Sequence, residues 1–122
     1  MKINTVCIVD DDRVYQLTTS KTIEKLNIVE NILSFYDGEQ AYNYLAEHVT
    51  DTELLPDIIL LDINMPFMDA WQFLESYGKM KNLLRKDIVI YVISSSISDH
   101  DIQKAKSDDN VKDYLIKPIG IN

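Results

Sequence analysis

Three groups of residues that could do chemistry stand far apart in this chain. Residues 10–12 are consecutive aspartates, Asp62 ends a run of four apolar residues, and Lys117 precedes a proline. Carboxylates can bind a divalent cation or act as nucleophiles, and an ammonium group can neutralise phosphoryl oxygens. These residue types suit phosphoryl transfer, which needs positioning and charge neutralisation more than covalent help from the protein.

Short apolar runs predict the strands that would position these residues. The predicted strands are residues 5–9, 30–36, 57–61, 88–93 and 114–116. Several of them carry no charge inside, which is typical of strands buried on both faces of a sheet.

Helical patterns alternate with these strands. Helices are predicted from about 13 to 26, after Asp37, after Asp69, and near 99–107. Three pairs of residues have the spacing of helix-capping pairs, namely Asp37 with Gln40, Asp69 with Gln72, and Ser98 with Asp101. Asp12 is expected to cap the first helix rather than bind a metal.

Alternation of strand and helix indicates an α/β fold with a doubly wound parallel sheet in one domain, residues 1–122. The carboxyl ends of parallel strands lie along one edge of a sheet, where such folds bind ligands. That edge would gather Asp10 and Asp11, Asp62, Ser94 and Lys117. Carboxylates about 4 Å apart repel by several kcal/mol at an intermediate dielectric, so we expect a hard divalent cation among them.

Four motifs, in this order and spacing, make the chain resemble the receiver domains of two-component response regulators, of the chemotaxis type. They are residues 9–12 (VDDD), 57–66 (DIILLDINMP), Ser94 and residues 114–118 (YLIKP). The resemblance covers nearly the whole chain. It implies a flavodoxin-like, five-stranded sheet in the order 2-1-3-4-5.

The resemblance also implies a role for each site residue. Asp62 would accept the phosphoryl group, and Mg²⁺ (or Mn²⁺) would be bound at Asp62, by Asp11 directly and by the backbone carbonyl of Asn64. Asp10 would act on the ion through water or by supporting its direct ligands. Lys117 would pair first with Asp62 and then with the phosphoryl oxygens.

The resemblance further implies that two residues respond to phosphorylation of Asp62. Ser94 would hydrogen-bond the phosphoryl group, and its movement would let Tyr114 change rotamer. The peptide bond before Pro118 would be cis.

The resemblance also implies the partners. The phosphoryl donor would be a histidine kinase or a phosphotransfer protein. The output would be switched binding to an unidentified partner rather than turnover of a metabolite.

Other interpretations stay open. An aspartate-nucleophile phosphatase usually has a second carboxylate two residues after the nucleophile, but here that residue is Asn64. A degenerate receiver without phosphorylation is disfavoured by Asp11, Asp62, Ser94 and Lys117. A flavodoxin-like nucleotide-binding module is disfavoured because the three glycines form no phosphate loop. Tyr114 could simply pack in its strand.

The chain departs from the family pattern in three places. Phe67 and Ala70 stand where the family usually has glycine, so Phe67 would either cover the site or present an aromatic ring to a partner. Residues 107–113 lack the usual small-residue turn, and Asn110 could supply a left-handed conformation instead. No final helix follows Pro118, which would leave one sheet face open. The chain would then be truncated, or a second protomer would cover that face as a homodimer.

Composition limits the partners, the disulfides and the cellular location that can be expected for this protein. A net charge of −8 argues against direct binding to nucleic acid or an anionic membrane. The single cysteine, Cys7, allows no internal disulfide and is expected to be a buried hydrophobe. No signal peptide or apolar stretch of membrane-spanning length is present, so a cytoplasmic location is expected.

Overall fold

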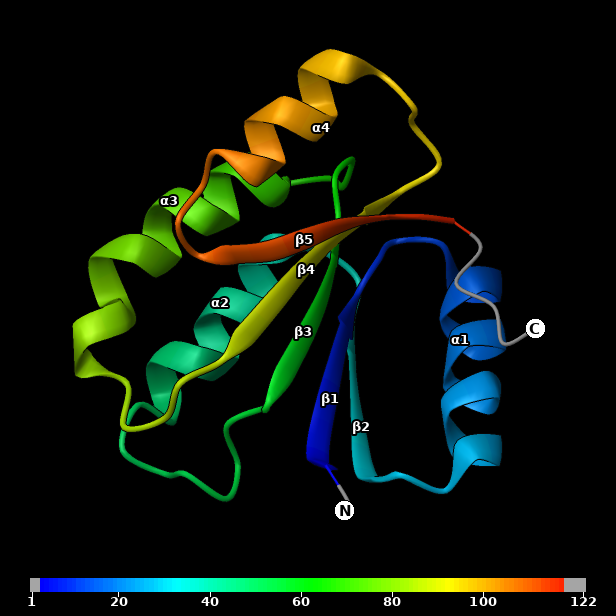
Figure 1. The fold of residues 1–122 in the computed structure, drawn as a ribbon. Coiled ribbons are helices and arrows are strands. Elements are labelled where there is room, and N and C mark those ends of the chain that lie inside the picture. The colour runs from blue at the N-terminus through cyan, green and yellow to red at the C-terminus, as the bar shows by residue number, and fades with distance from the viewer. Residues whose placement is uncertain (1–2, 118–122) are drawn as a thin grey trace.

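The computed structural model describes residues 3–117 as a parallel sheet whose strands alternate with helices (Figure 1). The strands are β1 (Ile3–Val9), β2 (Val29–Phe35), β3 (Ile58–Asp62), β4 (Val89–Ser94) and β5 (Val111–Ile116). The helices are α1 (Arg13–Leu26), α2 (Gly38–Glu47), α3 (Ala70–Met80), with the 3-10 turn η1 (Lys81–Leu83), and α4 (Asp99–Lys106). The sheet order β2-β1-β3-β4-β5 confirms the prediction.

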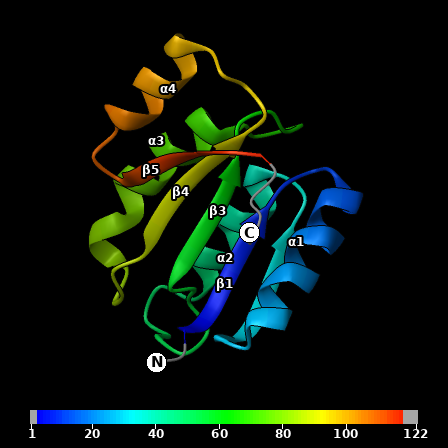
Figure 2. The same ribbon diagram turned by 45° about the vertical axis from the view of Figure 1, so that its right-hand side comes forward.

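The helices are divided unequally between the two faces of the sheet. Of the helices in the described part of the chain, only α1 lies on one side, whereas α2, α3 and α4 lie on the other (Figures 1 and 2). The main core fills the space between the sheet and this second group, where Cys7 is 1% exposed as predicted. The described residues hold four α-helices, all of them before β5. Pro118, with its expected cis bond, lies outside the described residues.

Side-chain caps explain where three helices begin. Asp12 accepts hydrogen bonds from the backbone N–H groups of Val14 and Tyr15, and Asp37 accepts one from Gln40. Asp69 and Gln72 form the predicted capping box, which satisfies backbone donors that the first turn leaves free.

Two local predictions are wrong. Ser98 is the N-cap of α4, but its side chain makes no capping bond. Ser96 takes the place of both capping partners, because its Oγ accepts from Ser98 N–H at 3.2 Å and donates to the Asp101 carboxylate at 3.0 Å. Asn110 is not left-handed; in residues 3–117 only Asn27 and Phe67 are non-glycine residues with positive φ. The Asp108 carboxylate accepts from Asn110 N–H at 2.8 Å and shapes this turn without a left-handed residue.

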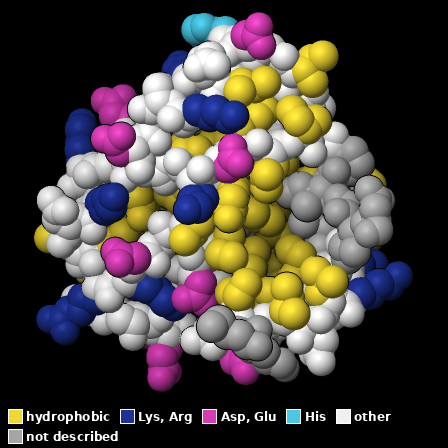
Figure 3. Space-filling model, viewed as in Figure 1, with side chains coloured by type: hydrophobic (Ala, Val, Ile, Leu, Met, Phe, Trp, Pro, Cys, Tyr) yellow, Lys and Arg dark blue, Asp and Glu magenta, His cyan; other side chains and the backbone are white. Residues whose placement is uncertain are grey.

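The sheet face beside α1 is only partly covered. In the central strand β3, Ile59 and Leu61 are fully buried, but Ile58 and Leu60 on the α1 side are half-buried. The prediction of full burial on both faces is therefore wrong for this face. A groove of about 190 Å³ runs between α1 and the sheet, and apolar side chains gather there (Figure 3).

Within residues 3–117, no helix is long and apolar enough to cross a bilayer.

Candidate functional site

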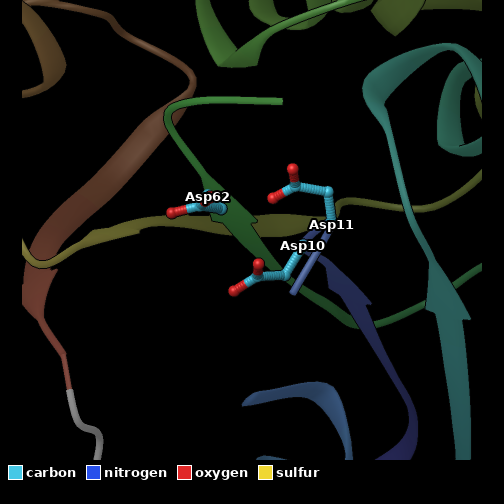
Figure 4. A group of neighbouring side chains, drawn as sticks. All are labelled: Asp10, Asp11 and Asp62. Atoms are coloured by element: carbon cyan, nitrogen blue, oxygen red, sulfur yellow. The ribbon is translucent and has the colours of Figure 1, made fainter. Parts of the chain in front are cut away.

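The acidic residues meet at the carboxyl edge of two neighbouring strands. Val9 pairs with Leu61, so Asp10 and Asp11 after β1 come next to Asp62 at the end of β3. One carboxylate oxygen from each aspartate lies within 4.8 Å of the other two (Figure 4). Asp10 and Asp62 are 2% and 8% exposed, whereas Asp11 is open to solvent.

Lys117 brings the only side-chain ammonium that forms ion pairs with these carboxylates in the described chain. Its Nζ lies 2.7 Å from Asp10 Oδ2 and 3.3 Å from Asp62 Oδ1. The backbone N–H of Lys117 donates to the Ser94 carbonyl at 2.9 Å, which holds the residue beside the end of β4. The lysine therefore bridges two carboxylates from separate strands.

Burial and charge act together on the titration of this cluster. Burial, helped by the negative charge of Asp10, raises the pKa of Asp62 to about 6, although Lys117 opposes the change. Burial tends to lower the pKa of Lys117, but the two carboxylates outweigh it and raise that pKa above its ordinary value. At neutral pH the cluster thus combines carboxylates with one ammonium, and negative charge is left over.

The three aspartates fit a small hard cation. Oxygens that coordinate Mg²⁺ at 2.0–2.1 Å lie roughly 3–4 Å apart, and the three carboxylates need little movement to reach that spacing. The exposure of Asp11 leaves room for water, which Mg²⁺ usually keeps in its coordination sphere.

Asn64 lies at the mouth of this cluster. It is exposed and lines an open recess of about 400 Å³ together with Asp11, Met65, Pro66 and Asp69. The structure therefore brings Asn64 to the same edge as the acidic residues.

Ser94 and Tyr114 are joined through the loop between β4 and α4. Ser94 is 4% exposed and its Oγ accepts from Ser96 N–H at 3.0 Å, whereas Ser95 is exposed. Tyr114 is 8% exposed, and its hydroxyl donates to the Ser96 carbonyl at 2.7 Å. A shift of Ser94 would therefore act on the same loop that holds the Tyr114 ring.

Phe67 has a strained backbone beside the site. Its φ is 66°, and Met68 N–H donates to the Pro66 carbonyl at 2.7 Å, which closes a three-residue turn around Phe67. Met68 O in turn accepts from Gly38 N–H, and a Cβ on Gly38 would come within 2.5 Å of that oxygen. The loop is thus fixed on both sides, and the Phe67 ring is 83% exposed rather than covering the site.

Replacing Phe67 by glycine is expected to raise the free energy of unfolding by about 1 kcal/mol. A left-handed residue with a Cβ costs about 1–2 kcal/mol, of which the greater freedom of glycine in the unfolded chain offsets part. Phe67→Ala is the matched control, because it removes the exposed ring but keeps the Cβ. Urea unfolding of both variants measures the difference, and equal stability of the two would contradict the strain.

Two residues that contribute to the geometry of the site were not identified from the sequence. Gln16 Nε2 donates to the carbonyls of Ile8, Asp10 and Phe35 at 3.0, 3.2 and 2.8 Å. The ring of Tyr15 lies against Lys117, with 4.2 Å between the ring centroid and Nζ. Both lie near the start of α1, three and four residues after Asp12, but no spacing in the sequence distinguishes them from ordinary packing residues.

Comparison with known proteins gives one consistent family. The family described as "Response regulator receiver domain" matches residues 6–122. A solved two-component response regulator from Cytophaga hutchinsonii is 30% identical, with a TM-score of 0.89, over 98% of this chain and 89% of that one. A response regulator receiver protein from Dyadobacter fermentans is 28% identical, with a TM-score of 0.84, over 97% and 89% of the two chains.

Curated relatives are longer. The probable C4-dicarboxylate response regulator DctR of Halalkalibacterium halodurans is 30% identical over 93% of this chain and 44% of that protein. The response regulator GtcR of Aneurinibacillus migulanus is 29% identical over 71% of this chain and 31% of that protein. The chain spans less than half the length of these relatives.

Proposed function

The chain belongs to the family of response regulator receiver domains, whose role is to accept phosphoryl groups, and we propose that Asp62 is the residue that accepts the group here. One observation carries the proposal. The Asp62 carboxylate ends β3 at the site edge, with Lys117 at 3.3 Å and the oxygens of Asp10 and Asp11 within 4.8 Å. This arrangement provides a nucleophile together with groups that neutralise phosphoryl charge.

The proposed reaction transfers a phosphoryl group from a phosphohistidine of a kinase or phosphotransfer protein. An Asp62 carboxylate oxygen attacks phosphorus, and the phosphorus–nitrogen bond breaks. The bonding pair leaves with the imidazole nitrogen, which is protonated by solvent, and Asp62 becomes an acyl phosphate. The chain acts in this reaction as a phosphoacceptor that assists its own phosphorylation and dephosphorylation.

The neighbouring residues have separate roles in the proposal. Mg²⁺ or Mn²⁺ would be bound by Asp11, Asp62 and the Asn64 carbonyl, with Asp10 acting through water, and would neutralise the phosphoryl oxygens. Lys117 would move from Asp62 to a phosphoryl oxygen.

Ser94 and Tyr114 would carry the signal outward. Ser94 would turn to hydrogen-bond the phosphoryl group, which would disturb the loop that holds the Tyr114 hydroxyl at Ser96. That change would alter binding of an output partner. Homodimerisation through the open sheet face and a cytoplasmic location stay predictions.

Intact-mass measurement tests the proposal. With Mg²⁺ and a small donor such as phosphoramidate or acetyl phosphate, we expect a single phosphoryl adduct, and we expect none when EDTA removes the ion. No adduct with either donor would favour a degenerate receiver. Continuous release of phosphate from many phosphate esters would instead favour a phosphatase.

A further inference from the structure

Among the contacts that the Lys117 ammonium makes with residues 3–117, the face of the Tyr15 ring is the one that the proposed function leaves without a role. We propose that Tyr15 is a positioning residue, whose ring holds Lys117 where it bridges Asp10 and Asp62. The inference rests on the proposed function, because it concerns the lysine that would neutralise the phosphoryl group.

The ammonium group has a different neighbour on each of three sides. Asp10 and Asp62 take two sides, at 2.7 and 3.3 Å, and the ring centroid lies 4.2 Å from Nζ on the third. The face of an aromatic ring is electron-rich and attracts a cation at this distance. The lysine side chain is 17% exposed, so the ring stands where water would otherwise solvate the charge.

A lysine needs such support more than an arginine would. Its charge sits on a flexible four-carbon stem with many rotamers. Tyr15, in contrast, is in the first turn of α1, where its N–H donates to the Asp12 cap at 3.0 Å. The helix cap thus holds the backbone that carries the ring, and the ring in turn limits the positions that the mobile ammonium can occupy.

The hydroxyl group of Tyr15 shows that the ring is the useful part. It is buried and has no hydrogen-bond partner among residues 3–117. A buried hydroxyl without a partner contributes nothing favourable to folding. Phenylalanine should therefore replace Tyr15 without loss, whereas an aliphatic side chain of similar bulk should not.

The rate of adduct formation at saturating Mg²⁺, measured over a range of phosphoramidate concentrations, tests the proposal. Tyr15→Leu should lower the maximal rate roughly three- to thirty-fold, the range that corresponds to a cation–π contact, without changing the Mg²⁺ requirement. Tyr15→Phe should stay within about twofold of the wild type on the same physical ground.

Tyr36→Leu is the matched control. It removes another cation–π contact of α1, between the Arg13 guanidinium and the Tyr36 ring at 4.3 Å, which does not involve Lys117. Its phosphorylation rate should equal that of the wild type.

A second measurement needs no phosphorylation. The ring current of Tyr15 should shift the NMR signals of the Lys117 Hε protons upfield in the wild type and in Tyr15→Phe. The shift should be lost in Tyr15→Leu, or in Tyr15→Met if the leucine variant does not fold.

The outcomes separate this proposal from the proposed function. A wild type without an adduct would contradict the function itself. Normal phosphorylation of the wild type and of Tyr15→Leu, with no upfield Hε signals, would overturn only the role of Tyr15. A Tyr15→Phe variant as slow as Tyr15→Leu would also overturn it, because the hydroxyl rather than the ring would then matter.

Discussion

Asp62→Asn is expected to form no phosphoryl adduct with any donor and, without Mg²⁺, to be more stable than the wild type at neutral pH. The loss of the adduct follows because an amide oxygen is a poor nucleophile and its phosphorylated product does not accumulate. The gain in stability follows because the substitution replaces a carboxylate that is buried, and that also faces the negative charge of Asp10, by a neutral amide.

The sign of the pH dependence follows from the pKa of Asp62. Burial and Asp10 raise this pKa from 3.8 to about 6, so the folded state holds the proton more tightly than the unfolded chain does. The wild type therefore loses stability as the pH rises from about 4 to above 6, whereas the Asp62→Asn variant has no such titration. At neutral pH we expect the variant to gain about 2 kcal/mol, which is less than the full shift because solvent reaches part of the site and reduces both the burial penalty and the repulsion.

Urea unfolding in EDTA at pH 4, 5, 6 and 7 measures this difference. The two stability curves should meet near pH 4 and separate as the pH rises. A difference that does not change with pH would contradict the repulsion. Adding Mg²⁺ should stabilise the wild type more than the variant, because the variant lacks one ligand.

Lys117→Met is expected to lower the free energy of unfolding by about 3 kcal/mol at neutral pH without Mg²⁺. Methionine keeps the apolar stem but removes the charge. Asp10, whose side chain is 3% exposed, then loses its partner at 2.7 Å and faces Asp62 without compensation. The variant should also be phosphorylated much more slowly, because the ammonium no longer neutralises the phosphoryl oxygens.

A double-mutant cycle with Asp10→Asn separates charge from packing. If the unpaired carboxylate causes the loss, Lys117→Met should cost little in the Asp10→Asn background. An equal loss in both backgrounds would show that the lysine stem packs in a way that methionine cannot replace.

The sequence was most informative where one physical rule governs many residues. Parallel strands share a carboxyl edge, so four short apolar runs were enough to bring Asp10, Asp62, Ser94 and Lys117 together. The bounds of α1 and the capping pair Asp69–Gln72 were also correct, because both follow from local sequence patterns.

The remaining features depend on tertiary packing. The Tyr15 ring meets Lys117 only because of the rotation of α1 relative to the end of β5, which no local pattern encodes. Similarly, the path of the loop places the Ser96 hydroxyl between Ser98 N–H and the Asp101 carboxylate, so these two groups bond to Ser96 instead of to each other. The strain at Phe67 arises because Gly38 and its neighbours fix the loop from outside.

The three hydrogen bonds of Gln16 have a mechanical consequence. A single amide joins α1 to the carbonyls of Ile8 in β1, of Asp10 just after that strand, and of Phe35 at the end of β2. We therefore expect a displacement of α1 to be transmitted to the Asp10 backbone. A partner bound to the exposed Val14 and Leu17 on the same helix would then act on the acidic site from a distance.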